Sequence, residues 1–492
     1  MKRGVVIPFR QDRYVALFLA LATTLSRLPF AADRLWEWDS VLYAHALEQG
    51  FHVDDALAGS RPHPPGYLFY VASAAIGRAL GLDSDHALIA VSIVASAVAV
   101  AACYLLCRRF AGPVVSLLLA VAFALDPLVW LHGEVAMPYI LLAAGSGILA
   151  LLFRSARGAR AARLGWVSLA FGVAAGFRQD LLLFLVPLWL WALWPAGPRA
   201  RLRATVALAA GCATWLIPTV ALSDGPLAYV ARTTRQLVGL SATSANADRS
   251  IALNLVLIGY SLGWALLLLT VAVAVLGLAR ALADRGRPLT GDGLFFVLWL
   301  LPPLLFYVFV HIGEWGFVLS VVPGLYVLLA WLIAPLASRL GRRARAGGAA
   351  LLAANAILGA LLFTAGGDPV FSAAALASHD RATDAKTAYI REQVPPDSSV
   401  ILAAAELLVA SYYLPDRTLR YSNANATPVH DLVLTHPLTL VVYEPSAEPD
   451  IAYLPAGTTR RSAGAGLALI DVPAGVVRLR GTDIEIVAGR PH

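Results

Sequence analysis

Charged residues are scarce in this chain of 492 residues, because Asp, Glu, Lys and Arg together make up only 14% of it. A soluble globular domain carries about 25% charged residues, so this composition excludes an ordinary cytosolic protein. Disordered chains combine low hydrophobicity with high net charge, whereas 59% of these residues are hydrophobic. What remains is a membrane protein that crosses the bilayer several times.

Cysteine is also rare, and Cys103, Cys107 and Cys212 all lie inside apolar runs. A structural disulfide is therefore not expected. The sequence contains no GxGxxG motif, phosphate-binding loop, zinc-ligand spacing or internal repeat. Its net charge of +7 comes from 38 basic and 31 acidic residues. The basic residues form short clusters between apolar runs, which indicates membrane topology rather than nucleic-acid binding.

Apolar runs predict the membrane-spanning part of the chain. Twelve runs fall at roughly 14–32, 66–80, 86–106, 113–131, 134–153, 164–177, 181–194, 204–222, 251–279, 293–310, 315–336 and 349–365. If all twelve crossed, the basic N-terminus and the Arg108-Arg109 loop would lie on opposite sides, against the positive-inside rule. The run 66–80 is short and contains Arg78, so we expect it to lie at the membrane interface. About eleven spans and a cytoplasmic N-terminus follow.

The pattern changes after residue 366, where no spanning run is left. We expect residues 1–366 to form a transmembrane domain with a large first extracytoplasmic loop at 33–85. Residues 367–492 are expected to form an extracytoplasmic α/β domain. Its expected strands are 398–404, 418–421, 438–443, 467–472, 476–479 and 483–487, and its expected helices are 406–414 and 428–435.

Acidic residues open the first predicted extracytoplasmic loop, in the stretch Trp36-Glu37-Trp38-Asp39-Ser40. Ionisable residues at membrane boundaries are candidates for function. Asp39 has two interpretations that do not exclude each other. One interpretation is that Asp39 is the N-cap of a helix beginning near Val41. The other is that Asp39 is a general base or metal ligand at the lipid boundary.

Arginines are uncommon in extracytoplasmic loops, so those that occur there are candidates for a structural or functional role. Arg178 either forms a salt bridge with Asp180 or belongs to an anion site. Arg232 and Arg235 are three residues apart, so they would share one face of a short helix, as a phosphate clamp requires. Carboxylates can activate a hydroxyl group, and arginines can hold a lipid-linked phosphate.

With these motifs together, the chain resembles the GT-C superfamily of membrane glycosyltransferases. The resemblance rests on an acidic motif in the first large loop, on about eleven spans and on a C-terminal extracytoplasmic domain. It is closest to the branch related to protein O-mannosyltransferases. The motifs similar to that branch are His63-Pro64-Pro65-Gly66-Tyr67 and Gly133-Glu134-Val135, whereas Trp38-Asp39-Ser40 and His311-Ile312-Gly313-Glu314 are similar to motifs of the superfamily in general.

The resemblance implies an enzyme that moves a hexose or pentose from a polyprenyl-phosphate donor to an acceptor hydroxyl at the extracytoplasmic membrane face. Asp39 would be the general base. Several relatives have adjacent acidic residues, but here Ser40 follows Asp39, and the second carboxylate is expected to be Glu134. Implied substrate contacts are Glu37, Tyr43, His63, Arg178, Arg232, Arg235, His311 and Glu314.

Two other functions stay open. A lipid or polyprenyl transporter or flippase would place ionisable residues near the bilayer midplane, often with internal repeats. A non-catalytic polyprenyl-phosphate-binding protein would keep the fold without the reaction. The expected partners are the donor, a protein, lipid or glycan acceptor, and membrane lipids, with no nucleic acid. The expected location is a bacterial inner or plasma membrane. The cofactor is open, with a divalent cation (Mg or Mn) as the candidate.

Overall fold

The computed structural model describes residues 10–54, 61–242, 251–285, 291–339, 341–421, 429–480 and 485–486. By its contacts the chain divides into two compact units. The helical unit comprises residues 1–31 and 64–375, and the mixed unit comprises residues 32–63 and 376–492.

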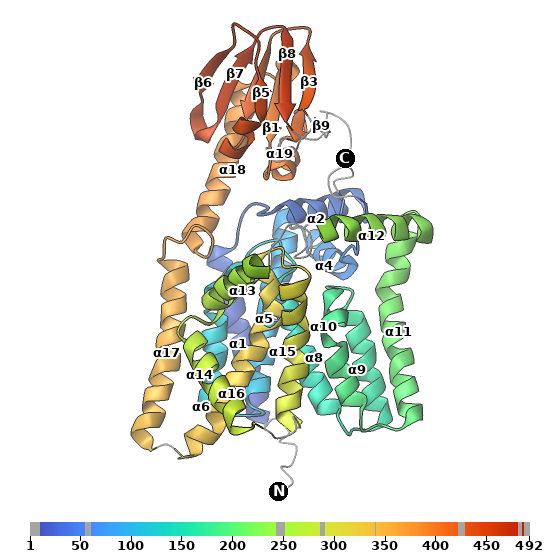
Figure 1. The fold of residues 1–492 in the computed structure, drawn as a ribbon, viewed down its shortest axis with the longest axis vertical. Helices are drawn as coiled ribbons and strands as arrows, with labels where there is room; N and C mark the ends of the chain where they lie inside the picture. The colour runs from blue at the N-terminus through green and yellow to red at the C-terminus, as the bar shows by residue number, and fades with distance from the viewer. Residues whose placement is uncertain are drawn as a thin grey trace. The chain divides into compact units, whose positions relative to one another are not determined.

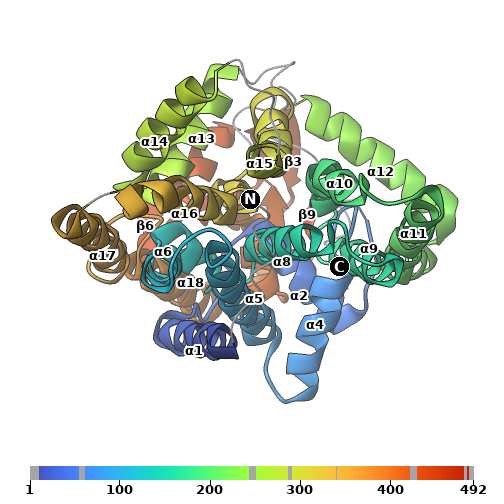
Figure 2. The same cartoon turned by 90° about the horizontal axis from the view of Figure 1, so that it is seen from below.

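The helical unit consists of apolar helices joined by short connections (Figures 1 and 2). Its first half contains α1 (Arg10–Arg27), η1 (Leu28–Phe30), α4 (Leu68–Ala79), α5 (Ser84–Cys107), α6 (Pro113–Ala124), α7 (Pro127–His132), α8 (Ile140–Ala156), α9 (Ala161–Ala174) and α10 (Asp180–Leu193). Its second half contains α11 (Pro198–Ala221), α12 (Gly225–Ala242), α13 (Ile251–Leu266), α14 (Leu269–Ala283), α15 (Gly291–Phe309), η2 (Trp315–Ser320), α16 (Val322–Arg339) and α17 (Arg342–Thr364).

Four of the described helices are long and apolar enough to cross a membrane, namely α5, α11, α15 and α17. The 24 residues of α5 rise about 36 Å at 1.5 Å per residue, which exceeds the hydrocarbon core of about 30 Å. Six further apolar helices are 10–17 residues long, and α4 is one of them. The chain is therefore an integral membrane protein, while the number of eleven spans and the interfacial position of α4 stay predictions.

Helices α9 and α11 pack closely along their length, as Figures 1 and 2 both show. Glycines permit this approach. A Cβ atom on Gly172 would lie 2.4 Å from the carbonyl oxygen of Leu208, and one on Gly211 would lie 2.4 Å from that of Leu169. Small residues at such crossings bring two helix backbones together, which is how helices associate in a membrane.

The apolar run 251–279 is not one straight helix. It forms α13 and α14, which meet at an angle of 107°. The break lies at Leu267, whose φ of 51° is left-handed although it is not a glycine. A single predicted span is thus a broken span or a re-entrant loop.

The mixed unit contains two sheets and the helices that flank them. Its helical elements are α2 (Trp38–Gln49), α18 (Ala373–Gln393, from residue 376 onward), η3 (Pro396–Ser398), α19 (Leu407–Tyr413), η4 (Pro445–Asp450) and η5 (Gly464–Gly466). Its strands are β1 (Ser399–Ala403), β2 (Leu419–Tyr421), β3 (Val429–Leu434), β4 (Leu438–Val442), β5 (Ile451–Tyr453), β6 (Thr459–Ser462), β7 (Ala468–Val472), β8 (Gly475–Arg480) and β9 (Glu485–Ile486).

The larger sheet has the order β6-β7-β4-β1-β2-β9 and the smaller one the order β3-β8-β5. Strand β1 is parallel to both β2 and β4, and the remaining pairs are antiparallel. The predicted α/β domain is therefore present. Only residues 485–486 of the predicted strand 483–487 lie within the described part of the chain.

One predicted helix of this domain is wrong. Of residues 428–435, Val429–Leu434 form strand β3, which pairs with β8 over its whole length. Burial alternates along the strand, so that His430, Leu432 and Leu434 are the more buried residues. This period of two is that of a half-buried strand, and β-branched Val429 and Val433 suit it.

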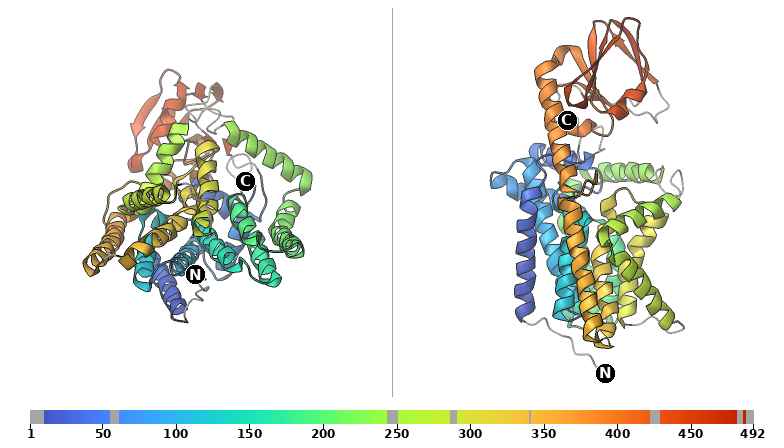
Figure 3. Two further views of the ribbon diagram at one scale, coloured as in Figure 1. Left: turned by 60° about the horizontal axis from the view of Figure 1, so that its bottom comes forward. Right: turned by 90° about the vertical axis from the view of Figure 1, so that its left-hand side faces the viewer.

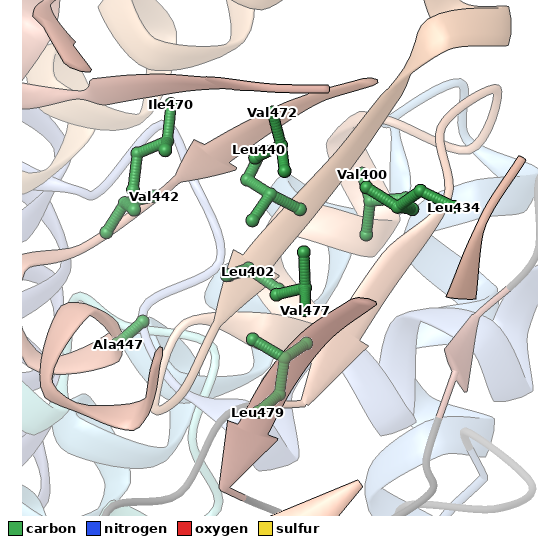
Figure 4. Close-up of a cluster of buried hydrophobic side chains, with 10 residues drawn as sticks. All are labelled: Val400, Leu402, Leu434, Leu440, Val442, Ala447, Ile470, Val472, Val477 and Leu479. Atoms are coloured by element: carbon green, nitrogen blue, oxygen red, sulfur yellow. The ribbon is translucent and has the colours of Figure 1, made fainter. Parts of the chain in front are cut away.

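Apolar side chains fill the mixed unit between its two sheets (Figure 4). The larger sheet contributes Val400, Leu402, Leu440, Val442, Ile470 and Val472, and the smaller sheet contributes Leu434, Val477 and Leu479. Two inner faces that pack in this way form the usual core of stacked sheets.

Part of the predicted first loop also belongs to the mixed unit. The sequence places the domain boundary at 366/367 and assigns the whole loop 33–85 to the helices. By contacts, residues 32–63 group with residues 376–492, whereas residues 64–85 group with the helices. The segment that carries Asp39 is therefore part of the same compact unit as the two sheets.

Candidate functional site

Asp39 lies in the first turn of α2, as the second residue of the helix. The N-cap is Glu37, whose backbone N–H donates to the Ser40 hydroxyl at 3.1 Å. The Ser40 backbone N–H in turn donates to the Glu37 carbonyl oxygen at 3.0 Å. The expectation that Asp39 is the N-cap of a helix beginning near Val41 is therefore wrong, because the helix begins at Trp38.

The Asp39 carboxylate contacts a histidine from the other end of the same segment. Oδ2 of Asp39 lies 3.5 Å from Nε2 of His63. Both side chains are partly accessible, with 29% of the Asp39 side chain and 18% of the His63 side chain exposed. A carboxylate in the first turn of a helix is stabilised by the helix dipole, by about 0.3–1 kcal/mol.

The segment with Asp39 is held by hydrogen bonds and an ion pair within the mixed unit. The Leu35 N–H donates to the Tyr413 hydroxyl at 2.8 Å, and the Tyr412 hydroxyl donates to Glu48 at 2.6 Å. Nε of Arg34 lies 2.6 Å from the Asp384 carboxylate. These contacts connect both ends of α2 to α18 and α19, so the helix has a defined place on the sheet domain.

Tyr43 shares α2 with Asp39 and is only 1% exposed. Its neighbours Val41, Leu42 and Ala44 are buried as well. The predicted substrate contact at Glu37 is the residue that caps the helix. Both predicted roles stay predictions, while the structure assigns Glu37 and Tyr43 to the beginning and the packed middle of α2.

In the helical unit, Arg178 lies in the turn between α9 and α10 and is only 3% exposed. Its Nε and Nη2 donate to the two carboxylate oxygens of Asp180 at 3.1 and 2.7 Å. Its guanidinium carbon lies 5.0 Å from the ring centroids of both Tyr67 and Tyr139, and 5.7 Å from that of Phe317. The salt bridge that was one of the two interpretations is thus present. Burial acts to lower the pKa of Arg178, but Asp180 and the two tyrosines raise it well above the usual arginine value.

The turn at 64–67 is packed against the turn that carries Arg178. The Phe69 N–H donates to the Gly176 carbonyl oxygen at 3.0 Å, and the rings of Phe69 and Phe177 contact edge to face. Gly176 is needed here because a Cβ atom would lie 2.4 Å from the Phe69 ring. This contact places Tyr67, which directly precedes α4, over the Arg178 guanidinium.

His311 and Arg178 share one aromatic neighbour. The rings of His311 and Phe317 lie 6.0 Å apart and nearly perpendicular, and the Phe317 ring also lies 5.2 Å from that of Tyr139. The Tyr307 hydroxyl donates to the Phe317 carbonyl oxygen at 2.7 Å, which fixes η2 in this place. Two of the predicted substrate-binding residues are therefore gathered around Phe317. Glu314 precedes η2 as its N-cap.

Arg232 and Arg235 lie on α12, which confirms that a helix carries both. Arg232 folds back to the corner between α11 and α12, where it donates to the Ser223 carbonyl oxygen at 3.0 Å and to Asp224 at 2.7 Å. Arg235 is exposed. Their predicted role as a phosphate clamp stays a prediction.

Glu134 has surroundings unlike those of Asp39. Its side chain is fully buried and accepts a hydrogen bond from Nε1 of Trp130 at 2.6 Å. The guanidinium of Arg27, also fully buried, lies 4.5 Å from the Trp130 ring and donates to the Ala124 carbonyl oxygen. Arg27 and Glu134 attract each other electrostatically. This buried cluster ties α1 to the α6–α8 connection.

The described residues contain no cluster of three or more His, Cys, Asp or Glu side chains arranged to hold a metal ion. The divalent cation suggested by the sequence stays a prediction.

Sequence reasoning passed over the aromatic residues around Arg178. Tyr139 directly precedes α8 and Phe317 lies in η2, far from each other and from Arg178 in the chain. Tyr67 was part of a quoted motif, but no role was expected for it. The available signal was the presence of aromatic residues beside predicted loop arginines, since arginine stacks on aromatic faces.

No family model matches the chain, and no curated protein matches it. Several solved structures are similar to the chain. ArnT from Cupriavidus metallidurans bound to undecaprenyl phosphate is 13% identical, with a TM-score of 0.56, over 93% of this chain and 97% of that one. ArnT in the apo state is 14% identical, with a TM-score of 0.54 and the same coverage. The Archaeoglobus fulgidus oligosaccharyltransferase is 13% identical, with a TM-score of 0.45, over 83% of this chain and 64% of that one.

The two ArnT structures share the fold of this chain, so the predicted fold class is confirmed: a helical membrane protein with a small C-terminal sheet domain. The branch related to protein O-mannosyltransferases stays a prediction.

Proposed function

We propose that the chain is a glycosyltransferase that takes a sugar from a polyprenyl-phosphate donor and transfers it to an acceptor hydroxyl, with Asp39 as the general base. The observation that carries the proposal is the partly exposed Asp39 carboxylate, 3.5 Å from His63 in the first turn of a helix. The fold supports it, since the similar ArnT structure is described as bound to undecaprenyl phosphate.

The proposed reaction is a single displacement. The acceptor oxygen attacks the anomeric carbon while Asp39 removes the hydroxyl proton, and a glycosidic C–O bond forms. The bond between the anomeric carbon and the phosphate oxygen breaks, and its electron pair leaves with the polyprenyl phosphate. A phosphate needs no proton to leave near neutral pH, so one base suffices. The configuration at the anomeric carbon is inverted.

His63 is proposed to orient the Asp39 carboxylate. A general base must come within about 2.6–3.2 Å of the proton that it removes, and a carboxylate held on one side has a restricted set of orientations. Only Pro64, Pro65 and Gly66 separate His63 from Tyr67 in the chain. The short motif from His63 to Tyr67 thus contains His63, which lies beside Asp39, and Tyr67, which lies beside the buried Arg178.

Arginines are proposed to stabilise the charge of the departing phosphate. Asp180 occupies Nε and Nη2 of Arg178, so Nη1 is the nitrogen that would donate to the phosphate. Arg232, Arg235 and His311 are further candidates for donor binding. Glu134 is proposed to act through the scaffold, because its carboxylate is fully buried and bonded to Trp130.

We further propose that transfer takes place at the extracytoplasmic face, with the N-terminus in the cytoplasm. The support is the sorting of basic clusters along the sequence. A reporter that is active only outside the cytoplasm, fused after residue 492, should be active in cells. An inactive fusion of the full-length, folded protein would reverse the orientation.

The test of the reaction is a donor panel with the purified full chain in lipid nanodiscs. Polyprenyl-phosphate hexoses and pentoses are supplied with a mixture of glycan, lipid and peptide acceptors, and free polyprenyl phosphate is measured. We expect release from one donor class, dependent on an acceptor. Tight donor binding without release from any donor would support the non-catalytic alternative. Movement of intact donor across a vesicle membrane would support the flippase alternative.

Metal use is tested in the same assay. Treatment with EDTA, followed by Mg²⁺ or Mn²⁺, should abolish and restore release if a divalent cation takes part. Unchanged release after EDTA would remove the cation from the proposed function.

A further inference from the structure

Helix α12 follows α11 after a sharp corner and runs crosswise to it, as Figures 1 and 3 show. The corner consists of Leu222, Ser223 and Asp224. Asp224 and Gly225 have φ values of 59° and 85°, which lie in the left-handed region and turn the chain sharply. The direction of α12 is thus set where α11 ends.

Two contacts within the helical unit hold α12 in this direction. Arg232 is the eighth residue of α12. It donates to the Ser223 carbonyl oxygen at 3.0 Å and to the Asp224 carboxylate at 2.7 Å. The Tyr229 hydroxyl donates to the Pro65 carbonyl oxygen at 3.3 Å. Only 13% of the Arg232 side chain is exposed. Both contacts are made by polar side chains on the side of α12 that faces the protein.

The polarity of α12 is the reverse of that of a helix on a soluble protein. At 100° per residue, Tyr229, Arg232, Thr233 and Gln236 share one side of the helix, and all four are partly buried. The opposite side, called here the outer face of α12, carries Leu227, Val230, Leu237 and Val238, with exposed fractions of 87%, 59%, 61% and 63%. In water an amphipathic helix turns its apolar stripe inward.

The polar residue within the outer face shows the same adaptation. The hydroxyl of Thr234, which is exposed between Val230 and Leu237, donates to the Val230 carbonyl oxygen of its own helix at 2.9 Å. A threonine that bonds back to the preceding turn satisfies its hydroxyl without water. Thr234 therefore needs no aqueous partner, and the exposed Arg235 lies at the edge of the outer face, where its long side chain can reach the aqueous boundary.

The outer face of α12 follows in the chain on the exposed apolar surface of α11. Helix α11 is one of the helices long and apolar enough to cross the membrane. Its exposed residues include Val206 at 60% and Ile217 at 66%. Leu222 at the corner is 50% exposed, and Leu227 follows on α12. Exposed apolar residues are therefore present on α11, at the corner and on α12, with the exposed Asp224 as the charged residue between them.

We propose that α12 lies in the interfacial zone of the bilayer, with its outer face inserted among the lipids and its polar side turned to the protein. The partner is the lipid bilayer itself. Interfacial helices bury an apolar face about 5–10 Å into the boundary between head groups and acyl chains. Arg232 is a positioning residue in this account, because it holds the corner that keeps α12 in the membrane plane. The proposal rests on burial and contacts within the helical unit and not on the proposed reaction.

The test measures where a spin label on the outer face lies. Val230→Cys is labelled with a nitroxide in full-length protein carrying Cys212→Ala, since Cys103 and Cys107 are buried. The protein is reconstituted in phosphatidylethanolamine/phosphatidylglycerol nanodiscs. Collision with oxygen, which concentrates in lipid, is compared with collision with a water-soluble nickel chelate. The matched control is Val433→Cys on β3, a valine of similar exposure (68%) on the sheet domain.

We expect the oxygen-to-nickel collision ratio at position 230 to be several-fold higher than at position 433. A ratio equal to that of the control would mean that the outer face lies in water, and the proposal would fail. Poor access of both reagents to position 230 would mean that protein covers the face, a second copy or another chain, and would also overturn it. Because the readout is physical, its result is independent of whether transfer activity is found.

A second variant tests the corner. Arg232→Gln removes the ion pair to Asp224, and we expect the label at position 230 to become more mobile, with a sharper spectrum. Arg232→Lys, which keeps the charge, should recover part of the restricted spectrum. An unchanged spectrum in Arg232→Gln would show that Arg232 does not position the helix.

Discussion

Asp39 and Glu134 are both carboxylates that the sequence singles out for catalysis, yet their surroundings differ. Asp39 lies in the first turn of a helix, with 29% of its side chain exposed and a histidine 3.5 Å away. Glu134 is fully buried, bonded to Trp130 and next to the buried Arg27. A base must reach the substrate proton, whereas a buried carboxylate needs a partner that offsets its loss of hydration. Access therefore separates a chemical role from a structural one.

The strongest way to break this comparison is to remove the buried carboxylate. Glu134→Ala leaves Arg27 buried without one of its opposing charges. Breaking a buried pair costs about 3–5 kcal/mol, and Asp126 also attracts Arg27, so we expect a loss of about 3 kcal/mol. Thermal unfolding in nanodiscs, followed by tryptophan fluorescence, measures it. Glu134→Gln should be milder, since its amide oxygen still accepts from Trp130.

The activity of these variants decides the role of Glu134. Turnover per folded molecule should stay near the wild-type value in Glu134→Gln. A Glu134→Gln protein of normal stability that releases no lipid phosphate would establish Glu134 as a catalytic residue, and the contrast with Asp39 would disappear.

Replacing Arg178, the arginine beside Phe317, is expected to have the next largest effect. A hydrogen bond to a charged group contributes about 1.5–3 kcal/mol, so Arg178→Gln should weaken donor binding by about tenfold or more. We expect the KM for the lipid-linked donor to rise more than kcat falls. Arg154→Gln, which breaks the ion pair with Asp292 elsewhere in the helical unit, is the matched control. Equal effects of the two variants would mean that Arg178 only stabilises the fold.

His63 should have a smaller effect. Its contact with Asp39 is partly exposed, and such pairs contribute about 0–1 kcal/mol. His63→Ala is therefore expected to lower kcat by less than about tenfold, with the stability of the mixed unit unchanged. A complete loss of turnover in a folded His63→Ala protein would mean that His63 touches the reacting groups and does more than orient Asp39.

The smallest expected effect concerns Asp471, a carboxylate that has no part in the proposed reaction. Hydrogen bonds from Arg461, and from Thr439, hold the pKa of Asp471 below its usual value. A lowered pKa in the folded state adds stability above the unfolded pKa of about 3.9, and this stability is lost as pH falls through the folded pKa. Asp471→Asn should slightly increase hydrogen exchange in β6 and β7 at pH 7. The difference should shrink as the pH falls below about 3.9 and vanish once Asp471 is protonated in the folded state. A difference that persists in the protonated protein would exclude this explanation.

The architecture could be predicted from the sequence because apolar runs and alternating strands are local signals. Helices α5, α11 and α17 fall on predicted runs, and β1, β4 and β7 fall on predicted strands. The break between α13 and α14 could not be predicted, since it lies within four consecutive leucines, 266–269. Neither glycine nor proline marks it, so the packing of the helices must determine it.

The candidate site was predictable to the same extent. The residue types and their motifs are local, and Asp39, His63 and Arg178 could be named. Their partners are not local. Arg27 and Glu134 are 107 residues apart in the chain, and the aromatic side chains around Arg178, namely Tyr67, Tyr139 and Phe317, come from three distant parts of the chain. Only the fold shows which carboxylate is accessible.

The most direct test of the account is single-turnover release of lipid phosphate by Asp39→Asn. The purified variant is loaded with the donor that the wild-type protein consumes, acceptor is added, and free polyprenyl phosphate is followed over time. Asp54→Asn, in the same segment, is the control for the chemical change. General-base catalysis contributes about 10²–10⁴-fold, so we expect release to slow by that factor while donor binding and unfolding temperature stay at wild-type values. Release at the wild-type rate from a folded, donor-bound Asp39→Asn protein would contradict the account.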